Sequence, residues 1–188
     1  FIMNKGFSML ELLLVLGIIA GLIVSAFIIY PKVKNAQYID IESKHISQIY
    51  AAVKSTYSGK SDYAGLSTTV IARPAQFFPD DMLTNKITWG ISAWGGYVVV
   101  DAVSDSPSKT SNSAFAITYS DVPSDICVRL ISAVQNSFYN IYVANKKGIS
   151  EKNIGTLVKS NGDELDLEAT ANVCSAEKIN NQISFVSI

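Results

Sequence analysis

The chain has 188 residues, of which 48% are hydrophobic and 16% are charged, and its formal net charge is −1. This length favours one domain, or one domain with an appendage, and it allows a proper core without metals or many disulfides. The low share of charged residues argues against a disordered chain or one that coats nucleic acid, because both kinds are rich in charge. The mean hydropathy of +0.25 is high for a soluble domain.

The apolar residues are concentrated near the beginning of the chain. From Leu12 to Pro31, 20 consecutive residues carry no charge. As a helix they would extend about 30 Å, the thickness of the hydrocarbon core of a bilayer. Residues 1–34 hold three lysines and one glutamate, a net charge of +2, and residues 35–188 hold 12 basic and 15 acidic residues, a net charge of −3. Neither part has a basic patch, so no direct binding of nucleic acid is expected.

Three interpretations of this apolar segment compete. A cleaved secretory signal has a shorter apolar stretch followed by an Ala-x-Ala site, and this segment has neither feature. A plain membrane anchor fits the length, with Tyr30, Lys32 and Lys34 placed for one interface, but it does not explain Glu11. A charged side chain costs about 2–3 kcal/mol at the centre of a bilayer and less near the interface, so Glu11 is expected to have a function and a partner.

The residues before the apolar run support the third interpretation. Lys5, Gly6 and Phe7 are followed by Glu11, the fifth residue counted from Phe7, and then by the apolar residues. This arrangement resembles the class III signal of type IV prepilins. The resemblance implies that a membrane peptidase cleaves on the cytoplasmic side between Gly6 and Phe7. It also implies that the new amino group is methylated, giving N-methylphenylalanine at Phe7, and that the apolar helix stays on the mature protein.

Glu11 is then expected to act in assembly. After cleavage Phe7 has a positively charged amine, and in a helical stack of subunits the Glu11 carboxylate of one chain can pair with the amine of another. This pairing neutralises both charges in an apolar interior and sets the axial register of the subunits. The alternative is a charge that is merely tolerated at the interface. Whether residues 1–6 are a native leader or a remnant of other origin stays open.

The helix is expected to continue beyond Pro31 and to end near Ser58 and Gly59. Four apolar residues at helical spacing make its second half amphipathic, so that it packs against a head; they are Ile39, Ile46, Ile49 and Val53. Charged residues lie between them: Lys34, Asp40, Glu42, Lys44 and Lys54. His45 is expected to be a surface or packing residue and not a metal ligand.

Three other residues of the helix are candidates for special roles. Pro31 is expected to bend the helix, because it has no N–H and clashes with the preceding turn. Gly17 and Gly21 form a small-xxx-small pair. They are either ordinary glycines of a membrane helix or a place of close helix approach or local unwinding in a filament.

The remainder of the chain predicts an α+β head in which a mainly antiparallel sheet packs on the long helix. Residues 59–86 are irregular, 94–96 predict a tight turn or a bulge, and 104–113 predict a hairpin loop. Runs typical of strands cover residues 87–89, 97–103, 114–119, 138–144 and 182–188.

A second helix is expected to begin near Pro123 or Ser124, with Asp121 or Ser124 as its cap. Its buried face comprises Ile126, Leu130, Ile131 and Val134. Residues 150–181 are expected to be mostly loop and short helix.

Cys127 and Cys174 are the only two cysteines. An exported head meets an oxidising compartment, so a disulfide is expected, with two independent buried thiols as the alternative. The bridge would tie the second helix to the C-terminal region and stabilise the head by about 3–4 kcal/mol in the chain-entropy model. Such a bridge matches the disulfide-closed variable region of type IV pilins.

No motif for catalysis, a cofactor or a metal is apparent. The chain has one histidine, no Gly-x-Ser-x-Gly sequence and no paired-cysteine redox motif, so it is not expected to be an enzyme. Four acidic residues match no EF-hand loop and are expected to form a solvated loop face: Asp163, Glu164, Asp166 and Glu168.

Features of the head extend the resemblance to the type IVb subclass of pilins. They are its length, the loop YSGKSDYAGLSTTV at 57–70, and the segment AFAITYSDVPSDICVRLISAV at 114–134, where a strand precedes a helix that carries the first cysteine. This subclass includes the toxin-coregulated, bundle-forming and conjugative thin-pilus pilins of enteric bacteria. Phe7 departs from the pattern, because type IVb pilins usually have Met or another residue after the cleavage site.

The resemblance implies a structural subunit, the major pilin of a type IV pilus used for attachment, cell contact, bundling or conjugative mating. Residues 1–6 would be the leader or its remnant, 7–31 the transmembrane and polymerisation helix, and 32–188 the periplasmic and then extracellular head. The expected partners are copies of the chain in a helical filament, the inner membrane before assembly, the prepilin peptidase and assembly machinery, and a host receptor or recipient cell surface. The final location would be a pilus on the bacterial surface.

Two alternatives have the same helix or fold but another role. The first is a minor pilin or a type II secretion pseudopilin. Glu11 argues against a minor pilin of the kind that lacks this glutamate, and a disulfide argues against the major pseudopilins. The second is a membrane-anchored periplasmic binding protein.

Overall fold

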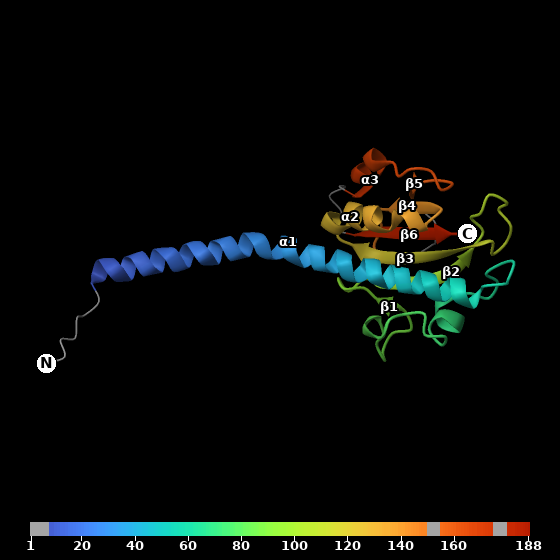
Figure 1. Cartoon of the computed structure of the whole chain (residues 1–188), viewed down its shortest axis with the longest axis horizontal. Coiled ribbons are helices and arrows are strands. Elements are labelled where there is room, and N and C mark those ends of the chain that lie inside the picture. Colours follow the sequence, from blue (N-terminus) through green and yellow to red (C-terminus); the bar gives the residue numbers. More distant parts are fainter. Residues whose placement is uncertain (1–7, 150–154, 175–179) are drawn as a thin grey trace. The chain divides into compact units, whose positions relative to one another are not determined.

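A computed structural model describes residues 8–149, 155–174 and 180–188. The chain divides into two compact units, one ending at Gln37 and the other comprising Tyr38–Ile188. The helix α1, Met9–Thr56, contributes to both units, and every strand belongs to the second (Figure 1).

The helix α1 agrees with the long helix that the sequence predicts. Residues 8–34 are exposed to solvent, and α1 is long and apolar enough, by length and composition, to cross a membrane. Pro31 lies inside the helix, where its missing N–H leaves the carbonyl of Phe27 without an intrahelical donor; the bend expected there stays a prediction. After Thr56 the chain turns at Gly59, whose φ of +87° suits the left-handed conformation that ends many helices.

The second unit is built on a six-stranded sheet with the order β1-β2-β3-β6-β4-β5, in which every pairing is antiparallel. The strands are β1 (Gly90–Ile91), β2 (Tyr97–Val103), β3 (Ala114–Val122), β4 (Asn140–Ala144), β5 (Thr156–Lys159) and β6 (Asn181–Ser187). The last strand of the chain, β6, lies between β3 and β4 and joins the β2–β3 hairpin to the β4–β5 pair. The sheet is therefore completed only when the C-terminal segment is in place.

Short helices connect and cover these strands. They are the π-helical turn η1 (Thr68–Ala72), the 3₁₀ turns η2 (Asp80–Met82) and η3 (Gln135–Ser137), and the helices α2 (Ser124–Val134) and α3 (Leu167–Cys174). The buried face predicted for α2 is confirmed, because Ile126, Leu130, Ile131 and Val134 are all buried.

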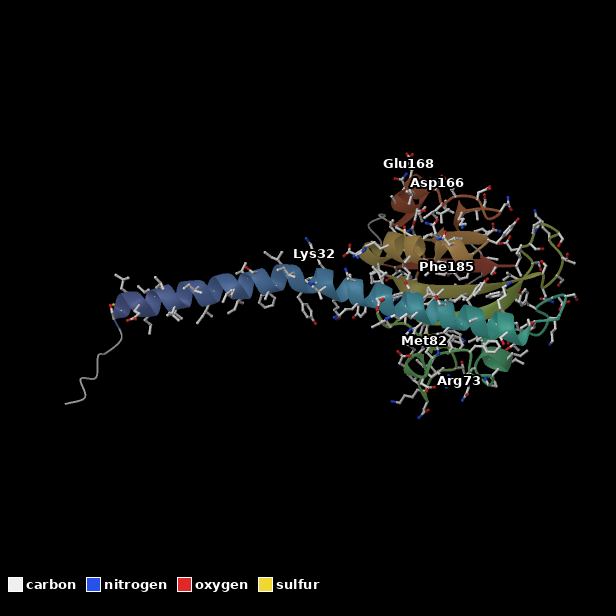
Figure 2. All side chains as sticks on the ribbon, in the orientation of Figure 1. Lys32, Arg73, Met82, Asp166, Glu168 and Phe185 are labelled. Carbon is white, nitrogen blue, oxygen red and sulfur yellow. A yellow bond between two sulfur atoms is a disulfide. The ribbon has the colours of Figure 1, made fainter. Side chains whose placement is uncertain are left out.

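The core forms where the second half of α1 meets one face of the sheet. Ile46, Ile49 and Val53 of α1 are at most 1% exposed, and they join one hydrophobic cluster with the strands and α2. On β3 the side chains that enter this cluster alternate, as the period of a strand requires; they are Phe115, Ile117 and Tyr119. The cluster also includes Phe185 of β6 and Met82 of η2, both labelled in Figure 2. Each large apolar side chain buried here contributes about 1.5–3 kcal/mol.

Some local predictions were wrong. Residues 87–89 form no strand: Ile87 makes an isolated bridge to Thr84, and β1 begins only at Gly90. Neither Asp121 nor Ser124 caps α2, because the cap position is taken by Pro123, which makes no side-chain bond. Asp121 instead belongs to β3, at a shift of register where its φ is +53°.

Two other differences concern the later strands. β4 starts at Asn140 and not at Phe138, because Phe138 is the C-cap of η3 and its N–H donates to the carbonyl of Gln135 in that turn. β5 lies in a segment expected to be loop and short helix, although α3 does provide the short helix. Residues 150–154 and 175–179 of that segment lie outside the described residues.

The predicted disulfide is confirmed. The sulfur atoms of Cys127 in α2 and Cys174 at the end of α3 are bonded, and both residues are buried. The bond links two helices through cysteines that are 47 residues apart in sequence. It therefore restricts the unfolded chain over much of the C-terminal half of the head.

Reduction of this disulfide is expected to lower the free energy of unfolding by about 3–4 kcal/mol, because the unfolded chain regains the entropy that the link removes. The measurement is urea denaturation of the full chain with and without a phosphine reductant. The control is the double variant Cys127→Ala/Cys174→Ala, on which the reductant should have no effect. Equal stability of the oxidised and reduced protein would contradict the prediction.

Candidate functional site

The predicted site residues of the stem fall into two groups. Gly6 and Phe7, the predicted cleavage and methylation site, lie outside the described residues. Glu11 lies in the first turn of α1 and is exposed, and a carboxylate at this end of a helix is favoured by the helix dipole. The roles predicted for these three residues stay predictions.

Gly17 and Gly21 lie on an open part of the α1 surface. A Cβ added at either position would have no heavy atom within 4 Å, and the hydroxyl of Ser25 donates to the carbonyl of Gly21 at 2.9 Å. The side chains around them project outward along the stem (Figure 2). Large apolar residues on this surface are more than 40% exposed, among them Leu12, Leu14, Leu16, Ile18, Leu22, Ile23, Phe27 and Ile28.

The head contains a fully buried carboxylate, Glu42, at a position where the sequence predicts a charged residue between apolar ones. Glu42 of α1 has no exposed surface. Its Oε1 accepts a hydrogen bond from the N–H of Ala93 at 2.5 Å, and its Oε2 accepts one from the hydroxyl of Tyr119 at 3.0 Å. The Nδ1 atom of His45 lies 3.3 Å from the same Oε2. A buried carboxylate is tolerated because these donors replace water.

His45 extends this arrangement to a third element. Its Nε2 atom lies 3.0 Å from Oδ2 of Asp81 on η2. His45 is 8% exposed, whereas the side chain of Asp81 is 66% exposed. We name Glu42, His45, Asp81 and Tyr119 the Glu42 cluster; it connects α1, η2 and β3.

The turn that carries the Ala93 N–H is held by the chain around it. The N–H of Ser92 donates to the carbonyl of Gly96, the N–H of Gly96 donates to the hydroxyl of Ser92, and Gly95 has a φ of +86°. The indole N–H of Trp94 donates to the carbonyl of Ser120 at 3.1 Å, and its ring packs on Tyr119. This confirms the turn predicted at residues 94–96 and explains how a loop presents a backbone donor to a helix.

The cluster changes the proton affinity of two of its members. The hydrogen bond to Glu42, with the charges of Glu42 and Asp81, raises the pKa of His45 above its ordinary value of 6.5, against the opposing effect of burial. Burial, followed by the charge and hydrogen bond of Glu42, raises the pKa of Tyr119 well above its ordinary value. Tyr119 is therefore a neutral donor, and His45 has a greater tendency to be charged.

The burial of Glu42 could have been predicted from helical spacing. Glu42, Ile46, Ile49 and Val53 follow one another at intervals of four, three and four residues, so Glu42 continues the apolar stripe by one turn. His45 is buried, as the packing interpretation of this residue requires. No sequence pattern identifies Asp81 or the Ala93 N–H, because both reach α1 from remote loops.

The four acidic residues near α3 are exposed, as predicted for a solvated face. Asp166 has a local structural role: its Oδ1 accepts the N–H of Ala169 at 2.9 Å in the first turn of α3. Figure 2 labels Asp166 and Glu168 at this edge of the head.

Comparisons with known proteins identify the family and fold. Residues 36–188 match the family model described as PilS N terminal. The crystal structure of TcpA, a type IV pilin from Vibrio cholerae El Tor biotype, is similar with a TM-score of 0.58 and 16% identity, covering 81% of this chain and 99% of that one. The crystal structure of a type IVb pilin from Salmonella typhi is similar with a TM-score of 0.57 and 16% identity, covering 78% of this chain and 97% of that one.

No curated protein matches the chain. The resemblance to type IVb pilins and the α+β fold predicted from the sequence are confirmed by the family match and the two similar folds. The chain belongs to the PilS N-terminal family and has the fold of a type IV pilin subunit.

Proposed function

We propose that the chain is the major subunit of a type IVb pilus and that it polymerises through the first half of α1. The observation that carries this proposal is the contrast between the two units. The stem, residues 8–34, exposes its apolar side chains on every side, whereas the head buries its own large core. The family and fold are those of structural subunits and not of enzymes.

The apolar surface of the stem is stable only in contact with apolar groups and not with water. Burying one large apolar side chain contributes about 1.5–3 kcal/mol, and the stem exposes many of them. A lipid bilayer covers the stem before assembly, and the stems of neighbouring subunits cover it in a filament. Because helix contacts replace lipid contacts, a subunit leaves the membrane without exposing its stem to water.

Processing at Gly6 prepares the subunit for this exchange. Cleavage by the prepilin peptidase gives Phe7 a charged amine, which is then methylated and keeps its charge. The Glu11 carboxylate of a neighbouring chain neutralises that amine inside the filament, where an unpaired charge is costly. The pairing forms only at one axial offset between subunits, so it selects the register of the helix.

The heads then form the outer surface of the pilus. The chain passes from the inner membrane, as a single-pass protein, to the bacterial surface, where its heads meet a host receptor, a recipient cell or other pili. The assembly machinery supplies the energy, so the chain itself needs no cofactor. Attachment, bundling and conjugative mating are the functions that such a surface serves.

Sheared surface fibres should consist mainly of a chain that begins at Phe7 and carries one additional methyl group on its amine. Intact-mass and N-terminal peptide spectra of the fibres measure both properties. The substitution Gly6→Leu should prevent cleavage and fibre formation, whereas Asn4→Ala, a control two residues away, should change neither. Fibres made of uncleaved chain would contradict the proposed processing.

The substitution Glu11→Ala should leave cleavage intact but reduce fibre yield more than tenfold. An unpaired charge in a buried pair costs about 3–5 kcal/mol, and a tenfold effect needs about 1.4 kcal/mol. Quantitative immunoblots of sheared and membrane fractions give the yield, with Ser8→Ala as the uncharged neighbouring control. Wild-type fibre yield from the Glu11 variant would refute the pairing. If fibres persisted after deletion of the gene for this chain, the chain would be a minor subunit and not the major one.

A further inference from the structure

We propose that the Glu42 cluster is a pH-sensitive latch that holds η2 against α1 when both ring nitrogens of His45 carry protons and releases η2 when one proton is lost. This inference concerns the head alone and does not depend on the proposed pilus function. It begins from the two carboxylate oxygens that face the imidazole ring.

Both nitrogens of His45 have an acceptor as their partner. Nδ1 lies 3.3 Å from Oε2 of Glu42, and Nε2 lies 3.0 Å from Oδ2 of Asp81. A neutral imidazole has one N–H and one lone pair, so it can donate to only one of these carboxylates. A charged imidazolium donates to both, and the closed arrangement is therefore that of the charged ring.

Among the groups around His45, the carboxylates of Glu42 and Asp81 favour its charged form, and a lysine opposes it. On α1, Lys44 is the nearby cation, and its ammonium group bonds Asp40 at 2.7 Å on the exposed side of the helix. On η2 the facing group is Asp81, and on β3 it is Tyr119, which remains neutral and donates to Glu42. The effect of Glu42 and Asp81 therefore outweighs the effect of burial, and the pKa of His45 is raised above 6.5.

The difference in burial decides which contact breaks. Glu42 has no exposed surface, and removal of a donor would leave its Oε2 atom with only the Tyr119 hydroxyl. The Asp81 side chain is 66% exposed and can turn to water at small cost. We therefore expect the neutral ring to keep its N–H on Nδ1, toward Glu42, and to release Asp81.

Release of Asp81 would loosen η2 beside an existing hollow. A space of about 320 Å³ lies between the two elements and is lined by Ile41, Lys44, His45, Gln48, Pro79 and Asp81. The raised pKa of His45 means that this stabilisation is complete below pH 6.5, the ordinary histidine value, and is lost as the pH rises through the folded-state value. The surface formed by η2 and α1 is accordingly tighter in mildly acidic than in alkaline medium.

The test follows the ring and η2 separately in the full chain held in detergent micelles. His45 is the one histidine of the sequence, so its ring gives a single histidine signal in a ¹H–¹³C NMR titration. Hydrogen exchange reports on the N–H groups of Met82 and Leu83, which bond within η2. After correction for intrinsic exchange rates, their protection should fall by about two- to fivefold as His45 loses its proton, the range for a partly exposed ion pair.

The substitution Asp81→Asn should remove this dependence without removing the side chain. An amide at this position can donate to the lone pair of Nε2, so the neutral ring is then held as well as the charged one, and the pKa of His45 should fall. Asp80→Asn is the matched control, because Asp80 carries the same charge on the same turn and its replacement should preserve the wild-type response.

Three results would overturn the latch. The first is a His45 pKa at or below 6.5 in the folded wild-type chain. The second is protection of η2 that stays constant while His45 titrates. The third is an equal response in the Asp81→Asn and Asp80→Asn variants. Because Asp81 is exposed, both variants should fold, which near-identical amide spectra away from η2 will verify.

Discussion

The packing of the second half of α1 against the sheet is the contact on which the rest of the structure depends. Ile46, Ile49 and Val53 bring one face of the helix into the core that β3, β6 and α2 also share. This contact fixes the end of a continuous helix whose first half, up to Lys34, remains exposed. The first half of the helix has apolar residues on all sides, and the second half has them along one stripe only. One helix can therefore lie in an apolar environment over its first half and pack against the head over its second half.

The same contact explains why a carboxylate is buried in the head. Glu42 occupies the stripe one turn before Ile46, so the packing of α1 takes it out of water. Ala93, Tyr119 and His45 replace the lost hydration with three contacts from a turn, a strand and the helix itself. A carboxylate satisfied in this way contributes little net stability, but it penalises any arrangement in which one of the donors is missing.

Local pattern was enough to predict much of the fold. The apolar run, the spacing of Ile46, Ile49 and Val53, and the runs of strand-forming residues in β2 and β3 each arise from residues close in sequence, and the structure contains the corresponding elements. Two features that the sequence did not reveal depend on remote partners. β5 is a four-residue edge strand defined by its pairing with β4, and Asp81 reaches His45 across 36 residues; neither contact leaves a local pattern.

The sequence by itself determined the long helix, the apolar stem, the type IV pilin resemblance at Gly6, Phe7 and Glu11, and the two cysteines available for a bond. Only the tertiary structure decided that β6 lies between β3 and β4, that Cys127 and Cys174 are joined, and that Glu42 meets Tyr119 and His45. The physical reason is the range of the interactions. Helix and strand periodicity act over a few residues, whereas strand order and the partners of a buried charge are chosen by which distant segments the core brings together.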